Sequence, residues 1–420
     1  MPRRLLSALI APAALACLVV SGTCQEAGQA GPPFDNLPAG WQVVQHFVVP
    51  ENQTAQIGRD LGGKIQRLTN TILAVDGRRI QVNIIRCASE PDARGIHAKI
   101  AGMKGNPAFC LLAGDSVIEF VGDDAALARR VTDELHLAAP PKDATYRIAA
   151  KLVPVEAANY MALNELSNLL TSLATIDDAQ ARARARQLAE RFQVGDRVTL
   201  RAHEDCTYSF TPEPIARSKT LGGDATVYTF GQLPDIAGLP YVTLTARVTT
   251  HATGVTPTTR KTDPSLLAPT QYWPVDDPKV QALAEQITAG CTDVGQKTDA
   301  LLRWLKPGAN IRFDGPVQGS RYGVVQVLDQ GFGHCWDFAD VFVTLARAAG
   351  MPARQVGGWL YGTSGHIWAE VLIEGTGWQQ VDPTGGGELT CGTSYIPYFV
   401  TEDGHMPILY AQMPTIELVE

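Results

Sequence analysis

The chain has 420 residues, of which 45% are hydrophobic and 19% are charged, and its formal net charge is −8. A chain of this length and apolar content is expected to fold as two or three domains with buried cores, and it is not broadly disordered. The negative charge argues against nucleic acid as a main partner, because phosphate binding needs clustered cations.

The first 30 residues have the features of a secretory signal peptide. Arg3 and Arg4 form a basic start, residues 5–20 are uncharged and mostly apolar, and small residues follow. We therefore expect an exported protein that is periplasmic, secreted or held at the cell surface. The apolar stretch is short for a membrane span and contains Pro12, so we rank a retained anchor lower.

The cysteines bear on lipid attachment, disulfides and metal binding. Cys17 and Cys24 would suit a lipoprotein, but the residues before them fit a lipid-attachment signal poorly. Export places the other six cysteines in an oxidising compartment. Their wide, irregular spacing contains no Cys-x-x-Cys pair, which argues against a zinc site. Cys87 and Cys110 lie in one region, and we weigh a disulfide and two buried thiols equally.

Residues 38–155 mix strand and helix patterns and predict a small α+β domain of unassigned role. The turn Asp76-Gly77 precedes a segment that alternates between apolar and polar residues. Residues 123–137 have an acidic start and apolar positions at helical spacing, which predicts a helix. The domain shows no pattern with evident chemistry, and we interpret His97 as a packed or surface histidine.

Two different patterns follow in the middle of the chain. Residues 156–193 predict a helical connector, and residues 194–260 predict a β-rich module similar to a sandwich, because Val- and Thr-rich alternation returns between Gly and Pro turns. Three connector arginines, Arg182, Arg184 and Arg186, occur at every second position. That spacing fans them around a helix, so we interpret them as a solvated face.

Residues 265–420 form the last predicted domain, and they contain a cysteine in a chemically informative place. Gly331 and Gly333 let the backbone turn tightly before Cys335, and apolar residues then recur at helical spacing until Gly350 ends the helix. Cys335 is therefore expected at the N-terminus of a buried helix, where the helix dipole and unpaired N–H groups favour a thiolate. The same N–H groups can hold an oxyanion, which suits an attack on a carbonyl.

A cysteine nucleophile needs a base and a group that orients the base. His366 begins a predicted strand and Asp382 ends the following one, so both would lie near the open end of a hairpin. A hairpin centred on the loop 374–377 places Asp382 opposite Ala369, on the face away from His366. Their contact therefore requires a bulge, a strong twist or an off-centre loop.

Four linked motifs occur in this region: Gly333-x-Cys335-x-Asp337, Arg347-Ala-Ala-Gly350-Met-Pro-Ala-Arg354, His366-x-Trp368-x-Glu370-Val371 and Gly377-Trp378-x-x-Val381-Asp382-Pro383-Thr384. In this order they resemble the transglutaminase-like superfamily, over the last third of the chain. The resemblance implies a papain-like α+β core in which the helix that bears the cysteine packs on an antiparallel sheet. It implies Cys335 as nucleophile, His366 as general base and then acid, and Asp382 as the orienting carboxylate.

The resemblance also implies an oxyanion donor upstream of the cysteine. Tyr322 is the best counterpart, and a packed tyrosine is the alternative. No pattern of clustered carboxylates indicates a calcium site, and we expect neither a cofactor nor a metal.

Two functions of different classes fit these patterns. The first is a thiol enzyme that forms a thioester on an amide of a protein or peptide and resolves it with water, as a protease or amidase, or with an amine, as a cross-linking enzyme. The second is a binding or scaffold protein without catalysis, which the intact Cys335, His366 and Asp382 disfavour. Acetyl transfer from coenzyme A uses the same residue types, and we rank it last because an exported protein lacks that donor.

Overall fold

The computed structural model describes residues 34, 37–104, 109–122, 124–135, 137, 143–157, 160–220, 223–258, 260–317, 319–361, 365–385, 391–406 and 409–419. The predicted signal peptide, including Cys17 and Cys24, lies outside the described residues. Helices and mainly antiparallel sheets alternate along the chain, which confirms the predicted α+β class. None of the helices in the described part is long and apolar enough to cross a membrane.

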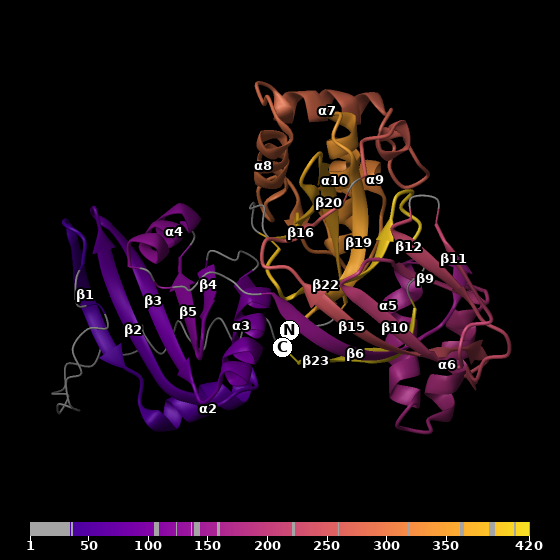
Figure 1. The fold of residues 1–420 in the computed structure, drawn as a ribbon, viewed down its shortest axis with the longest axis horizontal. Coiled ribbons are helices and arrows are strands. Elements are labelled where there is room, and N and C mark those ends of the chain that lie inside the picture. Colours follow the sequence, from indigo (N-terminus) through magenta and orange to yellow (C-terminus); the bar gives the residue numbers. More distant parts are fainter. Residues whose placement is uncertain are drawn as a thin grey trace. The chain divides into compact units, whose positions relative to one another are not determined.

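The first described region is one antiparallel sheet with three helices (Figure 1). The sheet has the order β1-β2-β3-β5-β4. Its strands are β1 (Trp41–Val48), β2 (Ile65–Val75), β3 (Arg78–Cys87), β4 (Cys110–Ala113) and β5 (Ser116–Val121), and its helices are α2 (Glu51–Leu61), α3 (Glu90–Lys104) and α4 (Ala125–Glu134). Asp76 and Gly77 form the predicted turn, with φ angles of 47° and 80°. Cys87 and Cys110 are both buried, and the structure has no disulfide between them, which favours the second of the two alternatives.

A second group of strands forms the β-rich part of the molecule. One sheet has the order β10-β15-β6-β23 and another the order β11-β12-β9. These strands are β6 (Ala144–Leu152), β9 (Arg197–Arg201), β10 (Cys206–Thr211), β11 (Ala216–Lys219), β12 (Ala225–Thr229), β15 (Val242–Thr250) and β23 (Tyr410–Leu418). Buried and exposed residues alternate along β15, as expected for a strand with one face on the core.

The same region contains the helices α5 (Tyr160–Leu173) and α6 (Ala179–Ala189) and short strand pairs. The pairs join β7 (Val155–Ala157) to β8 (Gln193–Val194) and β13 (Asp235–Ile236) to β14 (Leu239–Pro240). Strand β6 lies in the first predicted domain and β23 in the last, yet the two strands pair with each other in this sheet. The predicted domain boundaries stay predictions.

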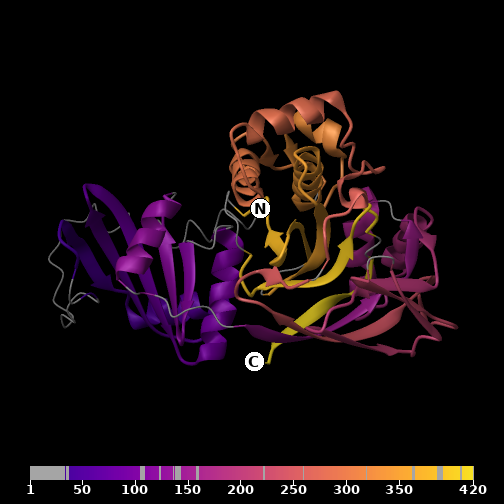
Figure 2. The ribbon, with the colours of Figure 1, turned by 45° about the horizontal axis from the view of Figure 1, so that its top comes forward.

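The last region has a five-stranded antiparallel sheet in the order β16-β21-β20-β19-β22. Its strands are β16 (Val255–Thr256), β19 (Ala353–Leu360), β20 (Gly365–Ile373), β21 (Gly377–Val381) and β22 (Tyr395–Thr401). Before β19 come η2 (Pro264–Leu267), α7 (Pro278–Thr288), α8 (Val294–Leu305), β17 (Arg312–Phe313), α9 (Val324–Gln330), β18 (Phe332–Gly333) and α10 (Cys335–Ala348). Helix α10 contacts β19 and β20 as well as α7, α8 and α9, so its residues 336–347 are all buried (Figures 1 and 2).

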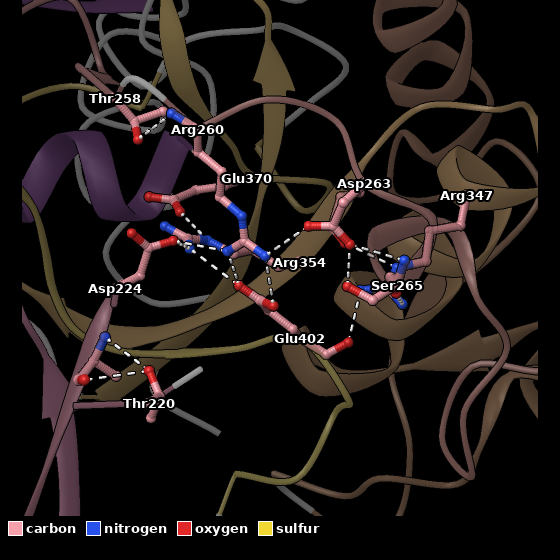
Figure 3. A network of polar contacts seen from close by, with 12 residues as sticks. Thr220, Asp224, Thr258, Arg260, Asp263, Ser265, Arg347, Arg354, Glu370 and Glu402 are labelled. Carbon is pink, nitrogen blue, oxygen red and sulfur yellow. Dashed lines mark hydrogen bonds and ion pairs between the residues drawn. The ribbon is translucent and has the colours of Figure 1, made fainter. Parts of the chain in front are cut away.

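Buried arginines join this sheet to the loop before β12 (Figure 3). Arg354, with 2% of its side chain exposed, pairs with Glu370 at 2.8 Å and with Asp224 at 2.5 Å. Its guanidinium lies 3.9 Å from the ring centre of Trp378. Arg260 extends the network to Asp224, Asp263 and Glu402. Since buried charges must be paired, the network constrains how these segments fit together.

Replacing Arg354 with alanine would leave the fully buried Glu370 without its cation. Breaking a buried ion pair costs roughly 3–5 kcal/mol, so we expect a loss of stability of that order in urea unfolding. The matched control is Arg217→Ala, which removes an ion pair to Glu213 whose side chains are 58% and 69% exposed. The control should lose no more than about 1 kcal/mol. Equal losses in the two variants would contradict a structural role for the network.

Candidate active site

Cys335 is the first residue of α10, as the sequence predicts. The preceding helix α9 ends at Gly331, whose φ of 69° turns the chain toward β18. Asp337, in the first turn of α10, accepts hydrogen bonds from the backbone N–H groups of His334 at 3.0 Å and Tyr322 at 2.6 Å. Burial raises the pKa of Asp337 to about 6, although the hydrogen bonds from these two backbone N–H groups act to lower it. Asp337 thus ties the segment before Cys335 to the helix.

His366 and Asp382 lie in direct contact, with Nε2 of the imidazole 2.8 Å from Oδ2 of the carboxylate. The ladder between β20 and β21 pairs Ala369 with Val381 and Ile373 with Gly377. The loop is therefore one residue shorter than the symmetric hairpin assumed from the sequence. Continued by one pair, this register places Asp382 level with Trp368, two residues from His366 and on the same face. An off-centre loop is thus what brings the two side chains together.

The shorter loop depends on two glycines. Gly375 has a φ of 79° and Gly377 a φ of 141°, both in a region that favours glycine. A Cβ on Gly377 would lie 2.3 Å from the carbonyl oxygen of Thr256, because β16 packs against the start of β21. The close approach of β16 therefore helps to maintain the register between β20 and β21 that places Asp382 beside His366.

Asp382 is buried and accepts four hydrogen bonds. Oδ1 receives the backbone N–H of Thr384 at 2.8 Å and its hydroxyl at 2.7 Å. Oδ2 receives the Tyr395 hydroxyl at 2.7 Å in addition to the contact with His366. Burial alone would raise the pKa of Asp382, but His366 and these donors hold it below its ordinary value. The arrangement therefore keeps an anionic carboxylate beside the imidazole.

His366 lies between aromatic rings and the thiol. Its ring is stacked on Trp368 at a centroid distance of 6.0 Å and meets Tyr395 at 6.1 Å. The imidazole also lies near enough to the Cys335 side chain for the thiol to affect its pKa. Burial lowers the pKa of His366, but the charge and hydrogen bond of Asp382 and the contact with Cys335 outweigh it and raise the pKa to about 10. At neutral pH the site can therefore hold an imidazolium next to the thiol.

Tyr322, the predicted oxyanion donor, lies against the segment that precedes Cys335. Its ring meets Phe332 edge-on at a centroid distance of 5.9 Å. Its hydroxyl is buried and has no hydrogen-bond partner within the described part of the chain. A Cβ on Gly315 would lie 3.4 Å from that hydroxyl. The structure thus leaves a buried donor free near the start of α10.

Two site residues were missed by the sequence analysis. Thr384 carried a local signal, because an aspartate often accepts the N–H of the residue two positions on in an Asx turn. Tyr395 carried none, since it is 13 residues from Asp382 and reaches it from another strand. Among the described residues, no three His, Cys, Asp or Glu side chains are placed to hold a metal ion.

Alanine at the two turn glycines should have unequal effects. Gly375→Ala meets no atom within 4 Å and should cost only its backbone strain, roughly 1–2 kcal/mol. Gly377→Ala adds the collision with Thr256 and should lower the melting temperature further. Because it also disturbs β21, it should slow alkylation of Cys335 at neutral pH, whereas Gly375→Ala should not. Similar alkylation rates in the two variants would show that the register does not control the site.

Part of this region matches a model of a known protein family. Residues 281–383 match the family model of the transglutaminase-like superfamily. These residues include the start of α10 and the hairpin that ends at Asp382. Among curated proteins, no sequence matches the chain.

Several solved structures are similar to the chain at low identity. A candidate cysteine protease from Cytophaga hutchinsonii is 17% identical over 66% of this chain and 89% of that chain, with a TM-score of 0.38. The periplasmic domain of TgpA from Pseudomonas aeruginosa is 19% identical over 46% and 64%, with a TM-score of 0.29. A transglutaminase from red sea bream is 11% identical over 75% and 50%, with a TM-score of 0.23. The family match confirms the resemblance seen in the motifs, and the C-terminal region has a transglutaminase-like fold.

Proposed function

We propose that the protein is an exported thiol enzyme that forms a thioester between Cys335 and an amide carbonyl of a protein or peptide. The single observation that carries this proposal is the hydrogen bond between His366 and Asp382, in a site where the imidazole interacts with Cys335 at the start of α10. A neighbouring imidazolium and a helix N-terminus both stabilise a thiolate. The basic and apolar pattern of the first 30 residues supports export.

The proposed reaction has two halves. The Cys335 thiolate attacks the amide carbonyl, and the oxyanion is held by N–H groups at the start of α10, with Tyr322 as a further candidate donor. His366 gives its proton to the amide nitrogen as the C–N bond breaks, which leaves a thioester and a free amine or ammonia. Water or a second amine then gives a proton to His366 and attacks the thioester, and Cys335 leaves as a thiolate.

Alkylation of the thiol by iodoacetate across a pH series tests the ion pair. The proposal requires Cys335 to react well below the pH range of a free thiol, because an imidazolium and a helix N-terminus both favour a thiolate. Iodoacetate is negatively charged and is attracted by the imidazolium, so the rate should fall again as the pH rises through the pKa of His366, which lies at about 10. The Asp382→Asn variant lacks the negative charge that raises the pKa of His366 against the effect of burial. Its His366 should therefore lose its proton at lower pH, and the alkaline limb of the profile should move with it.

Mass mapping of the labelled peptides assigns the reaction to Cys335, and Cys335→Ser should abolish that label. Cys291→Ala, which removes another partly exposed free thiol, is the control and should leave the profile unchanged. A Cys335 that reacts only near the pKa of a free thiol, about 8.5, would sink the proposal.

The acyl acceptor is tested with a glutamine-containing peptide and a dansylated primary amine. A cross-linking enzyme yields the amine adduct and ammonia, whereas a hydrolase yields an acid from the side-chain or backbone amide. Mass spectrometry separates these products, and Cys335→Ser should form none of them. A wild-type protein that turns over no peptide and shows an ordinary thiol would instead favour the binding or scaffold function.

Tyr322→Phe tests the candidate oxyanion donor. The substitution removes a hydroxyl that has no partner within the described residues, so stability should not change. Loss of one oxyanion donor typically costs about 10²–10³ in turnover, and we expect a decrease of that size on any peptide substrate. Alkylation forms no oxyanion, so its rate should stay as in the wild type. Unchanged turnover would identify Tyr322 as a packed side chain.

A further inference from the structure

Tyr395 reaches the candidate site from the far side of the sheet. Asp382 follows β21 and His366 lies on β20, whereas Tyr395 lies on β22, with β19 between β20 and β22. Gly358 of β19 pairs with His366 on one side. A Cβ on Gly358 would lie 2.1 Å from the ring of Trp368, so the missing side chain is what lets side chains of β20 and β22 meet across β19.

The result is a close group of rings around the carboxylate. Trp368 and Tyr395 meet edge-on at a centroid distance of 5.4 Å, and Tyr395 also meets His366 at 6.1 Å. Trp368 is held in turn by a hydrogen bond from its Nε1 to Gln380 Oε1 at 3.0 Å. The Tyr395 ring therefore packs firmly, and its hydroxyl points at Oδ2 of Asp382.

The hydroxyl of Tyr395 and the imidazole of His366 share one oxygen atom. Oδ2 of Asp382 is 2.7 Å from the hydroxyl and 2.8 Å from Nε2 of His366. Burial and the adjacent carboxylate raise the pKa of Tyr395 well above 10, so the phenol stays protonated and donates. The Tyr395 hydroxyl is a second donor to Oδ2 and withdraws negative charge from it. The carboxylate therefore stabilises the protonated form of His366 less strongly than it would without this hydrogen bond.

We propose that Tyr395 is a positioning residue for the reaction: its hydroxyl fixes the Asp382 carboxylate against His366 and sets the pH at which His366 releases its proton. The inference rests on the proposed function. The titratable groups that face the pair are Cys335 from α10, Tyr395 from β22 and Cys391 from the segment before β22. Burial raises the pKa of Cys391 well above its ordinary value, so Cys391 stays a neutral thiol and does not compete with the phenol.

Tyr395→Phe is the direct test, since it keeps the ring and removes the hydroxyl alone. Asp382 then loses a donor and becomes a stronger acceptor for His366. The alkaline limb of Cys335 alkylation should move to higher pH by roughly one unit. This direction is opposite to that of Asp382→Asn, so general damage to the site cannot imitate it.

Tyr398→Phe is the matched control. Tyr398 lies on the same strand and is more deeply buried, and its hydroxyl pairs with the hydroxyl of Tyr410 at 2.5 Å. Its removal should leave the pH profile unchanged. A Tyr395→Phe profile that coincides with that of the wild type, or a Tyr398→Phe profile that moves as far, would overturn the proposal.

NMR titration of the His366 ring protons gives a second measurement that does not need a reactive thiol. The pKa of His366 should be higher in Tyr395→Phe than in the wild type and unchanged in Tyr398→Phe. If the wild-type thiol behaves as a free one, the proposed function fails while the titration still reports on Tyr395. If the wild-type thiol is activated and neither measurement changes in Tyr395→Phe, only the role of Tyr395 fails.

Discussion

The hydrogen bond between His366 and Asp382 is the interaction on which the candidate site depends. Both side chains are largely buried, with exposures of 12% and 7%, so neither charge can rely on water. A buried pair is stable only with good geometry and with its remaining lone pairs satisfied. The off-centre loop supplies the geometry, and donors from Thr384 and Tyr395 satisfy the carboxylate. Several features that look unrelated in sequence therefore serve one contact.

The thiol comes to this pair from a different element and needs its own constraints. Cys335 lies at the first residue of α10, where Asp337 ties the preceding segment to the helix. Helix α10 in turn contacts β20, the strand that bears His366. Because the helix is buried along residues 336–347, it has little freedom to rotate or slide against the sheet. The packing of one helix thus sets the distance between thiol and imidazole.

The proposed catalytic function explains why a costly arrangement is present at all. Removing two charges from water costs several kcal/mol per ion, and their attraction roughly offsets that loss. A binding or scaffold protein would gain little from such a pair beside a partly exposed thiol. A thiol enzyme gains an imidazolium that stabilises its thiolate and later donates a proton. The buried network around Arg354 lies further along β19 and β20 and stabilises the sheet that carries the pair.

The amino-acid sequence by itself determined the features that depend on neighbours along the chain. The glycines before Cys335 and the apolar spacing after it indicate a helix start, and the motifs predict His366 and Asp382 as the partners of the thiol. The register of β20 and β21, the reach of Tyr395 and the pairing of β6 with β23 were decided only by the tertiary structure. Each of them joins segments whose fit depends on what packs between them, such as β16 against Gly377 and the missing side chain of Gly358. Local preferences act over a few residues, so they cannot select among such long-range pairings.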